Sequence, residues 1–163
     1  MKTCVFAGTF DPFTVGHKHM VDECLTKFDR VIVVIGDNPK KSSVMPYEDR
    51  KLAVESCYKS DERVVVVCYQ QIKDNFSSFL LDLGATVYVR GIRNDVDMQF
   101  EKQMEQKNKE LYPFIKTEYL FADDKHKNIS STLVRENILK GQSIKGLVPD
   151  ECVDIVLKSF GKN

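Results

Sequence analysis

The feature that most constrains the fold is an alternation of β-branched runs with segments of helical periodicity. Residues 30–36 and 63–68 are nearly continuous runs of Val and Ile, which is typical of strands buried on both faces. Residues 3–6, 85–89 and 118–121 are shorter runs that also favour strands. Strands that alternate with helices along a whole chain predict an α/β domain. We therefore expect a doubly wound domain with a five-stranded parallel sheet and helices on both faces.

Residues that begin or end helices mark the limits of the segments between these strands. Apolar residues in those segments recur at spacings of three and four, as in an amphipathic helix. Helices are expected after Gly16, after Pro46, between Asp74 and Gly84, from 95 to about 111, between Ser130 and Gly141, and after Pro149.

The composition excludes several classes of protein. The 163 residues fit one domain, residues 1–163. Lys plus Arg and Asp plus Glu number 24 each, so no net charge favours nucleic acid or a membrane surface. No run approaches the roughly 20 apolar residues of a membrane span, and the N-terminus lacks the features of a signal peptide. The five cysteines are an odd number and include no Cys-x-x-Cys pair, so neither a zinc site nor a redox motif is indicated. We expect a protein of the reducing cytoplasm, with no metal-ligating residues.

The most informative candidate site is the turn between the first strand and the first helix. It runs Gly8-Thr9-Phe10-Asp11-Pro12-Phe13-Thr14-Val15-Gly16-His17. A glycine at each end permits close backbone approach to a ligand and leaves the helix entrance open. The free N–H groups and the dipole of a helix N-terminus favour an anion. His17 lies on this first turn, so the sequence predicts a phosphate site here.

Three further segments follow predicted strands and carry suitable side chains. Arg90-Gly91-Ile92-Arg93 supplies two guanidinium groups, which bind phosphate through a planar fork of donors. Ile129-Ser130-Ser131-Thr132 supplies hydroxyls and free N–H groups at a helix start, although any helix cap also uses such residues. Lys41 belongs to the loop 37–43, where a lysine is usually only solvated. Because ligands bind beyond the carboxyl ends of parallel strands, we expect these segments to converge on one cleft.

The motifs together resemble those of a known family. The run from Gly8 to His17 is similar to the first signature of the cytidylyltransferase-like nucleotidyltransferases, and its Thr-x-Gly-His form resembles that of the phosphopantetheine adenylyltransferases. Arg90 to Arg93 resembles the Arg-Gly-Leu-Arg element of that family, and Ile129 to Thr132 its Ile-Ser-Ser-Ser/Thr signature. The resemblance covers nearly the whole chain and implies a Rossmann-like domain.

The resemblance also implies residue roles. Thr9, Lys41, Lys73 and Arg90 would bind the acceptor substrate, and His17, Lys41 and Arg90 would be the catalytic residues. The residues implied to surround ATP are Thr9, Phe10, His17, Gly91, Ile92, Arg93, Glu101, His126, Lys127, Asn128, Ile129, Ser130, Ser131 and Thr132.

The implied reaction is the reversible transfer of an adenylyl group from ATP to 4′-phosphopantetheine. Its products are dephospho-coenzyme A and pyrophosphate, in the penultimate step of coenzyme A biosynthesis. Mg²⁺ would be carried by ATP, and the family implies a homohexamer. Two alternatives remain open: a nicotinate-mononucleotide adenylyltransferase or cytidylyltransferase, and a non-catalytic nucleotide-binding module. Thr14, which stands where those sister enzymes usually have His, and the Arg90–Arg93 pair argue against the first alternative.

Overall fold

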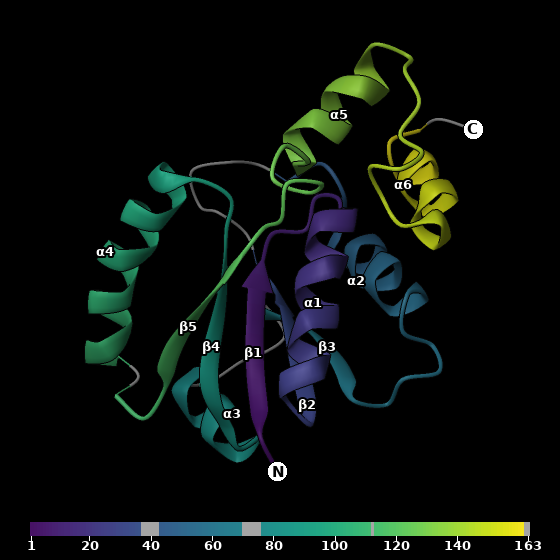
Figure 1. The fold of residues 1–163 in the computed structure, drawn as a ribbon. Coiled ribbons are helices and arrows are strands. Elements are labelled where there is room, and N and C mark those ends of the chain that lie inside the picture. Colours follow the sequence, from purple (N-terminus) through teal and green to yellow (C-terminus); the bar gives the residue numbers. More distant parts are fainter. Residues whose placement is uncertain (37–42, 70–75, 112, 162–163) are drawn as a thin grey trace.

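The protein is a five-stranded parallel sheet with helices on both faces (Figure 1). The computed structural model describes residues 1–36, 43–69, 76–111 and 113–161. Every neighbouring pair of strands is parallel, in the order β3-β2-β1-β4-β5, so the predicted fold class is confirmed. The strands are β1 (Thr3–Gly8), β2 (Arg30–Ile35), β3 (Val64–Cys68), β4 (Ala85–Ile92) and β5 (Lys116–Phe121).

The helices begin and end close to the predicted limits. Ser130 caps α5 by accepting a hydrogen bond from the amide of Leu133, and Gly141 lies just beyond its end with a φ of 68°. The predicted cap Asp74 lies outside the described residues. In the described part of the chain, no helix combines the length and apolar character needed to span a bilayer. The helices are α1 (Val15–Lys27), α2 (Tyr47–Ser56), α3 (Phe76–Asp82), α4 (Asp95–Leu111), α5 (Ser131–Leu139) and α6 (Val153–Ser159), the last preceded by a 3₁₀ turn at Asp150–Cys152.

The central strands bury both faces, as their continuous apolar sequences predict. Along β2, Val31, Val33 and Ile35 belong to one apolar cluster, while Ile32 and Val34 belong to another. The first cluster contains residues of α1, α2, α5 and α6, and the second contains Leu80 of α3. Because successive side chains of a strand point to opposite faces, helices must cover both sides of the sheet.

The strand order reverses direction at the pair β1 and β4. Two crossovers lead from β1 outward to β3, and the chain then returns to place β4 on the other side of β1. In open α/β sheets this switch point is where ligands bind. The candidate motifs therefore leave adjacent strands at the same edge of the sheet.

The fourth strand is longer than predicted. The sequence predicts a strand at 85–89 followed by the Arg90–Arg93 segment, but β4 continues to Ile92. Arg90, Gly91 and Ile92 pair with Tyr119, Leu120 and Phe121 of β5. Gly has low strand propensity, so this extension through Gly91 depends on the partner strand.

Candidate active site

A cavity of about 450 Å³ lies beyond the carboxyl ends of β1 and β4. It is lined by the β1–α1 turn, by the end of β4 with the start of α4, and by the loop and first turn leading into α5. Ser43 contributes from the segment before α2. In the described residues, segments far apart in sequence thus converge on one cleft, as expected.

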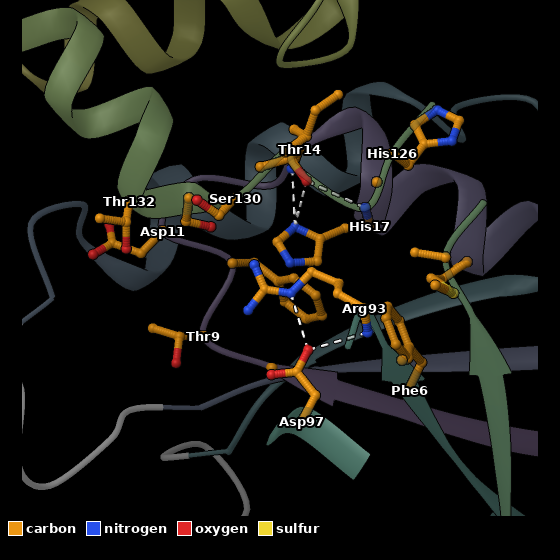
Figure 2. A pocket seen from close by; sticks show the side chains of 18 of the residues that line it. Phe6, Thr9, Asp11, Thr14, His17, Arg93, Asp97, His126, Ser130 and Thr132 are labelled. Atoms are coloured by element: carbon orange, nitrogen blue, oxygen red, sulfur yellow. Dashed lines mark hydrogen bonds and ion pairs between the residues drawn. The ribbon is translucent and has the colours of Figure 1, made fainter. Parts of the chain in front are cut away.

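His17 is fixed in orientation by the start of α1. Thr14 is the N-cap, and its hydroxyl accepts a hydrogen bond from the amide of His17. In return, Nδ1 of His17 accepts a hydrogen bond of 3.0 Å from the amide of Thr14. This reciprocal arrangement is a capping box. Since Nδ1 acts as an acceptor, the neutral ring carries its proton on Nε2, which is directed towards the cavity (Figure 2).

The surroundings of His17 favour its neutral form. Its ring stacks on Phe13, with centroids 5.7 Å apart, and meets Phe10 edge-on at 5.0 Å. Burial lowers the pKa of His17 from 6.5 to about 4, and the nearby positive charge of Arg93 contributes. At neutral pH His17 is therefore an uncharged hydrogen-bond donor in the absence of an anion. A bound phosphate would supply the negative charge that favours protonation.

Two residues that the sequence analysis did not select hold the β1–α1 turn in place. The carboxylate of Asp11 is buried and accepts hydrogen bonds of 2.9 Å from the amides of Val44 and Met45. The buried guanidinium of Arg50, on α2, donates to the carbonyl of Thr9 at 2.9 Å and to that of Gly36 at 3.2 Å. Asp11 lies in a turn and Arg50 in a helix, positions where a charged residue is usually exposed, so only their burial reveals these roles.

The other wall of the cavity is built around an ion pair. Nε and Nη2 of Arg90 donate to the two carboxylate oxygens of Glu101 at 2.7 and 2.8 Å. Burial alone would lower the pKa of Arg90, but the bond with Glu101 and the proximity of Tyr88 raise it overall. The sequence analysis assigned Arg90 and Glu101 to different substrates, whereas the structure pairs their side chains directly. Glu101 thereby orients Arg90 and balances its charge.

Arg93 repeats this arrangement at a more exposed position. Its Nε donates at 3.1 Å to Oδ2 of Asp97, in the first turn of α4. The backbone amide of Arg93 donates to the same oxygen. The guanidinium lies beside His17 at the mouth of the cavity (Figure 2).

The N-terminus of α5 forms the third side of the cavity. The hydroxyl of Ser131 donates to the carbonyl of Pro12 at 2.8 Å, and Nη1 of Arg135 donates to the carbonyl of Asp11 at 2.7 Å. The Ser130 hydroxyl is used as the helix cap. The serine hydroxyls therefore have structural partners, and the capacity for anions lies in the first-turn N–H groups of the helix.

The predicted site residues do not all reach the cavity. Ile92 is buried, and neither Ile92, Lys127 nor Asn128 is among the described residues that line it. Lys41 and Lys73 lie outside the described residues. The predicted residues that line the cavity are Thr9, Phe10, His17, Arg90, Gly91, Arg93, Glu101, His126, Ile129, Ser130, Ser131 and Thr132.

The described lining residues offer no free carboxylate cage for a metal. Asp11 accepts two backbone amides, Glu101 pairs with Arg90, and Asp97 pairs with Arg93. Mg²⁺ usually keeps several waters and is bound through substrate phosphates with few protein ligands. This donor set fits a magnesium ion that enters with a nucleotide.

Comparisons with known proteins show the family of this chain. The family model described as cytidylyltransferase-like matches residues 5–137. The chain belongs to this family of nucleotidyltransferases.

Similarity to curated relatives assigns the chain to a narrower family. The phosphopantetheine adenylyltransferase of Bacteroides thetaiotaomicron is 34% identical over 150 residues, which cover 92% of this chain and 97% of the relative. That of Thermotoga neapolitana is 35% identical, over 90% of this chain and 89% of the relative. Within the superfamily, this chain is a member of the phosphopantetheine adenylyltransferases.

A solved structure shares the fold at lower sequence identity. The structure from Vibrio parahaemolyticus, described as a candidate nicotinate-nucleotide adenylyltransferase, matches with a TM-score of 0.72 and 20% identity. The match covers 97% of this chain and 93% of that chain. At this identity the likeness extends to the fold only.

Proposed function

We propose that the cavity catalyses reversible adenylyl transfer from Mg-ATP to 4′-phosphopantetheine, giving dephospho-coenzyme A and pyrophosphate. The observation that carries the proposal is the arrangement around His17. The Thr14 amide fixes Nδ1 as an acceptor, so Nε2–H faces a cavity whose other wall bears Arg90 and Arg93. Membership of the phosphopantetheine adenylyltransferase family supplies the identity of the substrates.

The reaction needs positioning and charge stabilisation rather than a general base. The acceptor phosphate is already a nucleophilic dianion near neutral pH. The transferring group passes through a state with charge spread over its oxygens, which catalysis stabilises with fixed donors and cations. Among the described lining residues, His17 supplies a neutral ring donor, and the cations are Arg90, Arg93 and Arg135.

Residues on different sides of the cavity bind different phosphate groups of the substrates. His17 donates to an oxygen of the α-phosphate of ATP. Arg90, oriented by Glu101, anchors the phosphate of the acceptor together with Thr9. Arg93 and the first-turn amides of α5 restrain the leaving pyrophosphate, since cations and free N–H groups both bind phosphate oxygens.

The remaining predicted residues complete the assignment. Lys41 is expected to contact the transferring phosphates and Lys73 the pantetheine arm. Phe10, Gly91, Ile129 and the backbone of His126 would contribute to the nucleotide site. Mg²⁺ would be held mainly by the phosphates of ATP and would supply positive charge that neutralises part of theirs.

A panel of acceptors tests the proposal. Pyrophosphate release is measured with ATP or CTP against 4′-phosphopantetheine, nicotinate mononucleotide and a phosphorylated alcohol. Release with ATP and 4′-phosphopantetheine alone is expected. Release with nicotinate mononucleotide or CTP would instead assign the chain to a sister activity. Binding by calorimetry without any pyrophosphate release would make it a non-catalytic nucleotide-binding module.

Two further expectations follow from the family. We expect a cytoplasmic enzyme and a homo-oligomer, with a homohexamer implied. Val96 and Phe100 on α4 are 75% and 57% exposed, and a subunit contact would remove such apolar surface from water. Sedimentation velocity measures the assembly directly.

A further inference from the structure

A cluster of side chains of the types that ligate metal ions lies beside the cavity. It joins His19 of α1 to Asp123 and His126 of the loop between β5 and α5. One ligand atom from each residue can be chosen so that all lie within 4.8 Å of one another. The backbone of His126 approaches Gly16 at the start of α1, while its ring points away from His17 (Figure 2). The cluster is therefore adjacent to the phosphate site and separate from it.

Its internal contacts bring donors together from two elements. The rings of His19 and His126 are stacked, with centroids 4.7 Å apart. One oxygen of Asp123 lies 2.6 Å from Nδ1 of His126, and the other lies 3.8 Å from Nε2 of His19. Glu23, one turn beyond His19, has an oxygen 3.9 Å from the same Nε2.

The donor set selects a class of ion. Imidazole nitrogens suit Zn²⁺, Cu²⁺ and Ni²⁺, whereas Mg²⁺ and Ca²⁺ prefer oxygen ligands. Two imidazoles and a carboxylate form a common zinc ligand set, with Zn–N and Zn–O distances of about 2.0–2.2 Å. Ligand atoms around a tetrahedral zinc are then about 3.3 Å apart. The observed separations lie within 4.8 Å and bracket this spacing, so the ligand atoms of His19 would move inward, while Nδ1 of His126 and Oδ1 of Asp123, now 2.6 Å apart, would separate slightly.

We propose that His19, Asp123 and His126 form a binding site for a zinc-class transition-metal ion, with Glu23 placed to supply a fourth ligand. The ion would fasten α1 to the loop that leads into α5. Both elements also contribute to the cavity, so an ion here would restrain the nucleotide site without touching the reacting phosphates. The site differs from the magnesium that accompanies ATP in its ligands and its position. It does not rest on the proposed reaction.

Calorimetric titration of the full-length, metal-stripped protein with zinc chloride alone tests the site. The unaltered protein is expected to bind one zinc ion per chain. His19→Gln and Asp123→Asn are each expected to weaken zinc binding about tenfold or more, since even residues that only support a ligand contribute 10–100-fold. Asp124→Asn is the matched control, because it changes charge equally in the same loop but is expected to leave zinc affinity unchanged.

Cysteine thiols elsewhere in the chain could also bind the added zinc, so the test has to distinguish them from the histidine cluster. Sγ of Cys57 lies 3.5 Å from Sγ of Cys152 in the described structure, and such a pair can also hold zinc. The Cys57→Ser variant is expected to retain full zinc affinity, and the cobalt-substituted protein is expected to lack intense thiolate-to-metal absorption. Loss of binding in Cys57→Ser, equal affinity in His19→Gln and the unaltered protein, or no zinc binding at all would each overturn the proposal. Because no nucleotide is present, these outcomes are independent of the acceptor panel.

Discussion

The two principal walls of the cavity are built on different physical principles. The β1–α1 turn is held by apolar packing and by hydrogen bonds between backbone and side chain, and it presents a neutral histidine. The β4–α4 wall is held by ion pairs, Arg90 with Glu101 and Arg93 with Asp97. The first wall gains a rigid donor by excluding water, whereas the second carries cations whose charge is balanced until phosphate arrives. Substitutions in each wall should therefore fail in different ways.

The largest expected effect is the fall in turnover when His17 of the β1–α1 turn is replaced. His17→Ala should lower kcat by about 10²–10³, the usual loss when one stabilising donor is removed. His17→Gln is the control, because a glutamine at this position of a capping box can still accept the Thr14 amide. Both variants should remain folded by circular dichroism, and His17→Ala should lose turnover in steady-state assays. His17→Gln, whose side-chain amide can also donate, should lose less. Near-normal turnover in His17→Ala would remove His17 from the mechanism.

The next largest effect is on kcat/KM for the acceptor substrate when an arginine of the β4–α4 wall is replaced. Arg90→Lys replaces a planar fork with a single ammonium and breaks the bidentate pair with Glu101. Loss of one charge-assisted bond, about 1.5–3 kcal/mol, corresponds to about a 10–100-fold fall in kcat/KM for 4′-phosphopantetheine. Arg93→Lys, at the more exposed ion pair, should cost less for this substrate. Equal losses in the two variants would contradict the distinction between these arginines.

Two glycine-to-alanine substitutions, one in each wall, compare how tightly the two walls are packed. A Cβ on Gly8 would lie 3.0 Å from the ring of Phe10, which is itself enclosed by Phe6, Phe13 and His17. Gly8→Ala should therefore lower the free energy of unfolding by about 1–3 kcal/mol. A Cβ on Gly91 would meet Met20 at an ordinary 3.6 Å, so Gly91→Ala should leave stability unchanged or slightly higher. Urea unfolding measures both, and equal losses would show that the turn is no more tightly packed than β4.

The smallest effect is on the pH dependence of stability. The pKa of His17 is lowered from 6.5 to about 4 by burial and by Arg93, so the unfolded chain binds this proton more readily than the folded one. This contribution is fully present above pH 6.5 and is lost as the pH falls towards about 4. Urea unfolding at several pH values should show a shallower decline for His17→Gln than for the unaltered protein. Parallel curves would mean that the histidine is not desolvated.

Much of the site could be predicted from the sequence because its signals are local. The helix start at Ser130, the turn from Gly8 to His17 and the strands before each motif are set by neighbouring residues. The cap at Thr14 was not predicted, because the first helix was expected only after Gly16. The pairing of Arg90 with Glu101 and the contacts of Arg50 and Asp11 could not be predicted in this way. These partners are separated by 11 to 41 residues, and no periodicity relates them.

By itself the sequence determined the alternation of strands and helices, the parallel sheet and the edge at which the motifs meet, because the period of apolar residues and the handedness of crossovers fix these features. Only the tertiary structure decided that β4 continues through Arg90 to Ile92, because hydrogen bonds to β5 overcome weak local propensity. It alone also decided that His17 is neutral and that His19 meets His126. Charge state and side-chain proximity depend on which groups from distant segments exclude water together, and no local pattern contains that information.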